Sequence, residues 1–157
     1  MKLISFFFIL VFICQSGFSK NISVSILDGK KINSCVIEIK RGTYSLSTKD
    51  KVWILSKGSR ISISEGLDVA IDDSVKFRAS KIDLKGSDYV NHFEIQTKNN
   101  SYKFDDDLQV FMLNREIEFI NDVDLDHYVA GVVEGEAGYG LPMEYYKLQA
   151  ILCRTYA

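Results

Sequence analysis

The chain has 157 residues, of which 46% are hydrophobic and 25% are charged, and its formal net charge is −2. This composition is typical of a folded globular protein of one ordinary domain, and it excludes an intrinsically disordered chain. No block of basic residues occurs, so nucleic acid is not among the expected partners.

Residues 1–19 have the pattern of a secretory signal peptide. Lys2 supplies the positive start, residues 3–14 form an apolar run that is short for a bilayer span, and Gly17 and Ser19 offer a small-x-small cleavage site. We therefore expect export to the periplasm, the cell envelope or the extracellular space.

The same segment has two alternative interpretations. It can be retained as a membrane anchor, because an uncleaved apolar run holds a protein at the bilayer. Cys14 also suggests a lipoprotein, but the bulky residues Phe12 and Ile13 make a poor lipobox, so this interpretation is the weakest of the three.

Residues 20–118 are predicted to be rich in β-strands. Apolar and polar residues alternate, as in residues 22–26, and a turn signal such as residues 28–29 follows about every ten residues. This spacing is typical of antiparallel sheets with one buried and one solvent-exposed face. The period changes from two to 3.6 near Phe119, so we expect an α+β fold with helices in residues 119–157.

Two groups of residues in the β-rich region suggest ligands but favour a structural interpretation. Tyr44, Trp53 and Tyr102 are of the kind that stacks on sugar rings, although pairing in the core or across strands is the preferred interpretation. The three aspartates at residues 105–107 lack the spacing of a calcium loop, and an acidic hairpin turn is predicted there.

Cysteines and histidines give no metal motif. Cys35 and Cys153 lie outside residues 1–19, and export would permit a disulfide between them, but we expect both to be buried small hydrophobic residues. His92 and His127 are isolated in the sequence and are interpreted as surface or packing residues. The sequence therefore predicts no metal site in this chain.

A first helix is predicted to start near Leu125. Three valines within residues 129–133 share one face, because they are spaced three and four positions apart. Asp124 or Asp126 can cap the start of this helix, since a short carboxylate accepts hydrogen bonds from the unpaired backbone N–H groups there. Glycines within residues 138–140 then mark a loop.

A second helix is predicted to start at Pro142, whose fixed φ suits the first turn. Glu144 lies in that first turn, facing the positive end of the helix dipole. Apolar residues at helical spacing predict two neighbouring buried stripes. The first consists of Tyr145, Leu148 and Leu152, and the second of Tyr146, Ala150 and Cys153.

The strongest functional signal is a set of residues at fixed spacing in the helical end. They are Tyr128, Gly131, Val132, Val133 and Glu136 in the first half, and Pro142, Glu144, Lys147, Gln149, Ala150, Arg154, Thr155 and Tyr156 in the second. At these positions the sequence resembles the SpoIID/LytB family, the sporulation stage II protein D and amidase-enhancer proteins. The family motif reads approximately Tyr-Leu-x-Gly-Val-Val-x-x-Glu-Met, a short loop, and Pro-x-Glu-Ala-Leu-Lys-Ala-Gln-Ala-x-x-Ala-Arg-Thr-Tyr.

The resemblance implies a bacterial cell-wall protein that acts on peptidoglycan glycan strands as a lytic transglycosylase. It places Glu136 at the position of the family's catalytic glutamate, and this single residue is expected to act as both acid and base. Arg154, Tyr156 and Gln149 match other family positions and are the expected substrate-binding residues.

The local sequence supports this role for Glu136. The residue is expected at the C-terminal end of the first helix, where unpaired carbonyls and the negative dipole end favour the protonated form that a general acid needs. Glu134 falls on an open position of the motif and is interpreted as a surface residue. For Arg154, an ion pair with Glu144 or Asp126 is the alternative to substrate binding.

Some features depart from the family pattern. Ala137 replaces a methionine, Tyr145 and Tyr146 replace small apolar residues, and Cys153 replaces an alanine. Family domains continue beyond the second helix, so residues 119–157 are expected to be an incomplete start of the SpoIID/LytB core with little or no turnover. In some family members the part that follows carries zinc ligands, and no cofactor is expected in this chain.

Two other classes of function stay open. One is a non-catalytic amidase enhancer, which would bind glycan or a cell-wall amidase without cleaving the glycan. The other is a secreted β-rich binding or structural module with a helical appendix.

Overall fold

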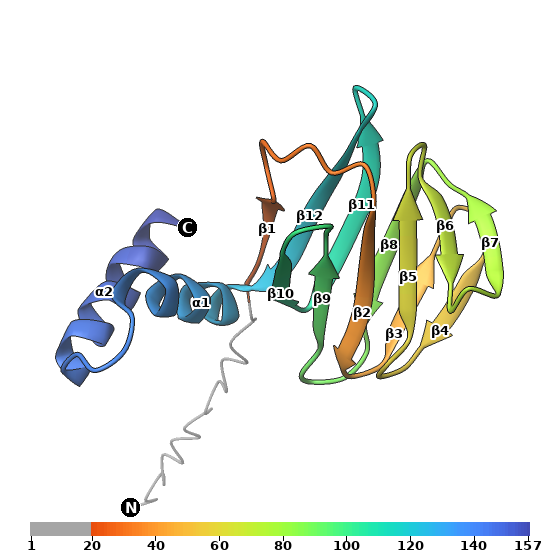
Figure 1. Cartoon of the computed structure of the whole chain (residues 1–157). Helices are drawn as coiled ribbons and strands as arrows, with labels where there is room; N and C mark the ends of the chain where they lie inside the picture. Colours follow the sequence, from red (N-terminus) through yellow and green to blue (C-terminus); the bar gives the residue numbers. More distant parts are fainter. Residues whose placement is uncertain (1–19) are drawn as a thin grey trace, which may run out of the picture.

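A computed structural model of the protein describes residues 20–157, so the predicted signal peptide at residues 1–19 lies outside the described residues. Two six-stranded sheets pack face to face, and a pair of helices lies beside them (Figure 1). Every neighbouring pair of strands is antiparallel. The predicted α+β fold with an antiparallel β-rich region is therefore confirmed.

The strand order of each sheet shows that the chain passes repeatedly between the two layers. In spatial order, the first sheet contains β1 (Asn21–Ile26), β12 (Glu116–Asp124), β11 (Asp107–Leu113), β8 (Lys81–Gly86), β3 (Tyr44–Ser47) and β4 (Val52–Leu55). The second contains β10 (Ser101–Asp105), β9 (His92–Gln96), β2 (Cys35–Arg41), β5 (Arg60–Ser64), β6 (Asp68–Ile71) and β7 (Val75–Arg78).

The core lies between the two sheets and follows from the alternation in the sequence. Side chains on successive residues of a strand point to opposite faces, so alternate apolar residues meet in the middle. In β5, for example, Ile61 and Ile63 are buried while their neighbours are not. Burying one such side chain stabilises the fold by about 1.5–3 kcal/mol. The fully buried side chains, from both sheets, include Ile37, Ile39, Tyr44, Leu46, Ile82, Leu84, Phe93, Ile95, Leu108, Val110 and Phe119.

Two of the three aromatic residues, Tyr44 and Trp53, pack within this sandwich, as the preferred interpretation predicted. Tyr44 is fully buried and meets Phe93 edge-on, with ring centroids 6.2 Å apart. Trp53, on the edge strand β4, stacks on Phe77 of the edge strand β7 at 4.5 Å, and so closes one side of the sandwich. Tyr102, on the edge strand β10, instead contacts Lys30, whose ammonium group lies 4.2 Å from the ring centroid.

The prediction of an acidic hairpin turn at residues 105–107 is wrong. Asp105 ends β10 in the second sheet, and Asp107 begins β11 in the first, so the chain crosses between the sheets at Asp106. Asp106 adopts a left-handed backbone conformation with φ of 62°, which aspartate tolerates better than most residues. Turn-forming residues indicate that the chain changes direction, but they do not specify which sheet the next strand joins.

Both cysteines of the described chain are free. Cys35 begins β2 and is buried in the core, where burial raises the pKa of its thiol to about 12. Cys153 lies half-buried in the helical end. The interpretation of Cys35 as a buried small hydrophobic residue is confirmed, and the structure contains no disulfide between the two residues.

The helices are α1 (Leu125–Ala137) and α2 (Met143–Tyr156). They form a hairpin that stands to one side of the sandwich, next to β1 and β12 (Figure 1). The strand β12 runs through the expected boundary at residues 118 and 119 and leads directly into α1. Within residues 20–157, no helix is long and apolar enough to cross a membrane.

The expected burial of one stripe on α2 is wrong. Tyr145, Leu148 and Leu152 are 44%, 57% and 44% exposed, and no residue of α2 is buried. The neighbouring stripe of Tyr146, Ala150 and Cys153 is the half-buried one. Helical periodicity shows which residues share a face, but it does not show whether another element covers that face.

Candidate functional site

The first helix is fixed at its start by an aspartate cap. The side chain of Asp124 accepts hydrogen bonds from the backbone N–H groups of Asp126, at 2.7 Å, and His127, at 3.3 Å. Of the two predicted candidates, Asp124 is therefore the cap. Since β12 ends at the same residue, the cap sets the direction in which α1 leaves the sandwich.

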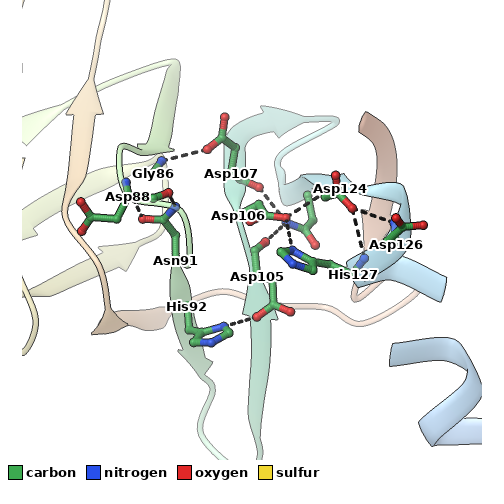
Figure 2. Close-up of polar contacts among 11 residues, drawn as sticks. Gly86, Asp88, Asn91, His92, Asp105, Asp106, Asp107, Asp124, Asp126 and His127 are labelled. Atoms are coloured by element: carbon green, nitrogen blue, oxygen red, sulfur yellow. Dashed lines mark hydrogen bonds and ion pairs between the residues drawn. The ribbon is translucent and has the colours of Figure 1, made fainter. Parts of the chain in front are cut away.

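A second aspartate ties this helix start to the crossing between the sheets. Asp106 Oδ2 accepts from the backbone N–H of Asp124 at 3.0 Å and contacts Nδ1 of His127 at 3.0 Å (Figure 2). The hydrogen bond to Asp106 raises the pKa of His127, because the nearby carboxylate favours the charged imidazolium. We call Asp106, Asp124 and His127 the junction cluster.

The other two aspartates of residues 105–107 also have protein partners. Asp105 pairs with His92, and Asp107 Oδ1 accepts from the backbone N–H of Gly86 at 2.8 Å (Figure 2). Asn121 Nδ2 donates to the backbone carbonyls of both residues, at 2.7 Å each, and so holds the crossing in place. Partial burial raises the pKa of Asp107.

Residues 20–157 contain no group of three or more His, Cys, Asp or Glu side chains arranged to hold a metal ion.

Glu136 lies in the last turn of α1 and meets the middle of α2. Gln149 Nε2 donates a hydrogen bond to Glu136 Oε2 at 2.6 Å, and the same nitrogen lies 3.9 Å from Cys153 Sγ. Glu136 is exposed, whereas Gln149 is half-buried between the helices. The structure thus joins two of the predicted site residues, which are thirteen positions apart in the sequence.

The loop between the helices is held by Tyr146. Its hydroxyl donates to the carbonyl of Gly138 at 3.0 Å and accepts from the backbone N–H of Leu141 at 3.1 Å. Gly138 ends α1 with φ of 66°, a conformation that glycine adopts without strain. Tyr146 departs from the family pattern, and its part in fixing the loop could not be found from the sequence.

An open groove of about 780 Å³ runs between the two helices. Its walls are apolar, with Val129 and Val133 on α1 and Ala150 on α2. Glu134 contributes to the lining of this groove, and Glu136 does not. The groove and the carboxyl group of Glu136 are therefore separate features of the hairpin.

Arg154 and Tyr156 do not contact Glu136. Arg154 Nη1 donates to Asp126 Oδ1 at 2.6 Å, which confirms the alternative prediction of an ion pair with this residue. Tyr156 is 87% exposed at the end of α2. Lys147 forms an exposed ion pair with Glu144 at 3.0 Å. The substrate-binding role of Arg154 and Tyr156 stays a prediction.

Comparison with known proteins identifies the same part of the chain as the sequence motif did. Residues 113–157 match the model of a family described as Stage II sporulation protein, SpoIID. The match begins at the end of β11 and includes β12 and both helices. No curated protein and no solved structure matches the chain significantly.

Proposed function

Because residues 113–157 carry the SpoIID family match, which indicates a SpoIID-type protein with a cell-wall role, we propose that the protein is a peptidoglycan lytic transglycosylase. Its substrate is the glycan strand, and Glu136 is the catalytic residue. The observation that carries the proposal is an exposed carboxyl group, at the family's glutamate position, with one oxygen held by Gln149.

One carboxyl group is enough for this reaction. Glu136 in its acid form protonates the glycosidic oxygen between N-acetylmuramic acid and N-acetylglucosamine, and the bond from C1 to that oxygen breaks. The carboxylate then takes the proton of the muramic C6 hydroxyl, whose oxygen attacks C1 and closes a 1,6-anhydro ring. Since the nucleophile belongs to the substrate, the second carboxylate of ordinary glycosidases is dispensable.

The surroundings of Glu136 leave room for a bulky strand. A Cβ atom added to either Gly135 or Gly138 would meet no atom within 4 Å, so the surface beside Glu136 is open on both sides. Tyr156 exposes an aromatic ring of the kind that stacks on sugars. Arg154, although paired with Asp126, keeps other guanidinium N–H groups for the carboxylate of a muramic residue.

The second candidate function is a non-catalytic amidase enhancer. The exposed apolar residues Tyr145, Leu148 and Leu152 on α2 favour it, because such a face suits contact with another protein. This function needs no carboxyl group at position 136. The two candidates therefore differ in their dependence on Glu136.

Export belongs to the same proposal, since peptidoglycan lies outside the cytoplasmic membrane. It is supported by the charge and apolar pattern of residues 1–19. Expression with residues 1–19 in a bacterial host, followed by mass measurement, tests it. A mature protein that begins at Lys20 is the expected result, and a full-length protein in the membrane fraction indicates a retained anchor.

The activity is tested with glycan strands stripped of peptide stems, and mass spectrometry detects 1,6-anhydromuramic ends. Because Glu136 lies on an open surface, the protein is used in excess over glycan ends so that slow cleavage is seen. We expect anhydro ends from the wild type and from the Glu134→Gln control, and none from Glu136→Gln. Anhydro ends from none of them, with strands still retained in a pull-down, would leave only the binding function.

A further inference from the structure

We infer that Gln149 is a positioning residue, which holds Glu136 Oε2 as an acceptor and leaves Glu136 Oε1 as the atom that transfers the proton. The inference rests on the proposed function, because it assigns a role within the same reaction. It also changes the expected role of Gln149, which the sequence placed among the substrate-binding residues.

The assignment follows from the donor and acceptor properties of the two groups. The Nε2 amide group of Gln149 can only donate hydrogen bonds, and it faces Glu136 Oε2 at 2.6 Å. A protonated carboxyl group has one O–H oxygen and one oxygen that only accepts. The acid proton of Glu136 is therefore placed on Oε1, which has no hydrogen-bond partner among residues 20–157.

A second contact supports this orientation of the amide. Cys153 Sγ lies 3.9 Å from Gln149 Nε2, and sulfur is a weak acceptor. With the nitrogen facing both groups, the two amide hydrogens point toward acceptors. Since Gln149 and Cys153 lie one turn apart on α2, the helix itself maintains this geometry.

The hydrogen bond also strengthens as the reaction proceeds. A hydrogen bond to a carboxylate is roughly twice as strong as one to a neutral group. When Glu136 gives its proton to the glycosidic oxygen, Gln149 gains this charge-assisted bond. An interaction that is stronger after proton transfer than before lowers the barrier and does not tighten substrate binding.

Kinetics test this role with Gln149→Met, which is close to isosteric and removes the donor. We expect kcat for anhydro-end formation to fall about tenfold, with KM within about twofold. Lys147→Met is the matched control on the same helix, since the ion-pair partner of Lys147 within residues 20–157 is the exposed Glu144. A higher KM with unchanged kcat would overturn the inference and return Gln149 to substrate binding.

A second measurement does not depend on activity. In ¹⁵N-labelled full-length protein, the side-chain amide signal of Gln149 is assigned by its loss in Gln149→Met. We expect the chemical shift of this signal to change with pH as the carboxyl group of Glu136 gains or loses its proton. Glu136→Gln should abolish this response, whereas Glu134→Gln should preserve it.

The two measurements separate the inference from the proposed function. If the wild type forms no anhydro ends, the proposed transglycosylase activity is refuted. The pH response of the amide signal then tests by itself whether Gln149 is paired with Glu136. A response that depends on Glu136 supports Gln149 as the partner of that carboxyl group. If the pH response of the Gln149 amide signal is the same in Glu136→Gln as in the wild type, the inference is overturned, whatever the activity.

Discussion

The sandwich and the helical hairpin differ in how far their apolar residues are buried. In the sandwich, apolar residues from both sheets are removed from water and form one continuous core. In the hairpin, only Leu125 and Val129 are buried, and α2 has no buried residue. Yet the matches to the SpoIID motif lie almost entirely in the hairpin. The hydrophobic core and the proposed site thus lie in different parts of the chain.

This division predicts where substitutions unfold the protein. Phe93→Ala empties a fully buried site that packs against Tyr44 and Phe104, so the free energy of unfolding should fall by about 3–5 kcal/mol. Leu148→Ala, on the exposed face of α2, should change it by no more than about 0.5 kcal/mol. Urea denaturation followed by circular dichroism measures both. Equal losses would mean that the hairpin is part of the cooperative core.

The junction cluster should show a smaller and more local effect. Asp106→Ala leaves the backbone N–H of Asp124 without its acceptor and removes the partner of His127. Losing such a bond costs about 1–3 kcal/mol. Hydrogen exchange should accelerate in the first turns of α1 while the amides of β5 stay protected. Uniform acceleration across the sandwich would contradict a local role for Asp106.

A smaller effect than the loss of Asp106 is the pH dependence of this cluster. The pKa of His127 is raised in the folded state, so its pairing with Asp106 contributes fully below the unfolded value of about 6.5 and is lost as pH rises through the folded value. The His127 side chain is 40% exposed to solvent, which limits the effect to about 1 kcal/mol or less.

Comparison with His127→Gln isolates this effect, because all other titratable groups are the same in both proteins. The wild type should exceed the variant in free energy of unfolding by more at pH 6 than at pH 9, as measured by urea denaturation. A difference that grows toward high pH would have the wrong sign for this account.

Much of the fold could be predicted, because alternation and helical spacing are local properties of the sequence. The period of two predicted the β-rich region, and the start near Leu125 and the loop glycines predicted α1 and its end. Local patterns do not show which residues or strands far apart in the sequence contact each other. Asp106 was therefore assigned to a hairpin turn, although the chain crosses between sheets there.

The candidate site likewise has one part that the sequence predicts and one part that it does not. The position of Glu136 in the motif indicates it as the candidate catalytic residue. Its contact with Gln149 could not be predicted, because the loop that Tyr146 fixes sets the register of α2 against α1. Periodicity alone likewise assigned Leu148 to a buried stripe, which the structure leaves exposed.

The most direct test of the account combines chemistry and stability in one variant. Glu136→Gln keeps the size of an exposed side chain and removes the acid. We predict that it loses all anhydromuramic ends while its free energy of unfolding stays within about 0.5 kcal/mol of the wild type. Unchanged formation of anhydro ends would contradict the assignment of Glu136. A large loss of stability would mean that Glu136 contributes to folding, and it would contradict the separation of the proposed site from the hydrophobic core.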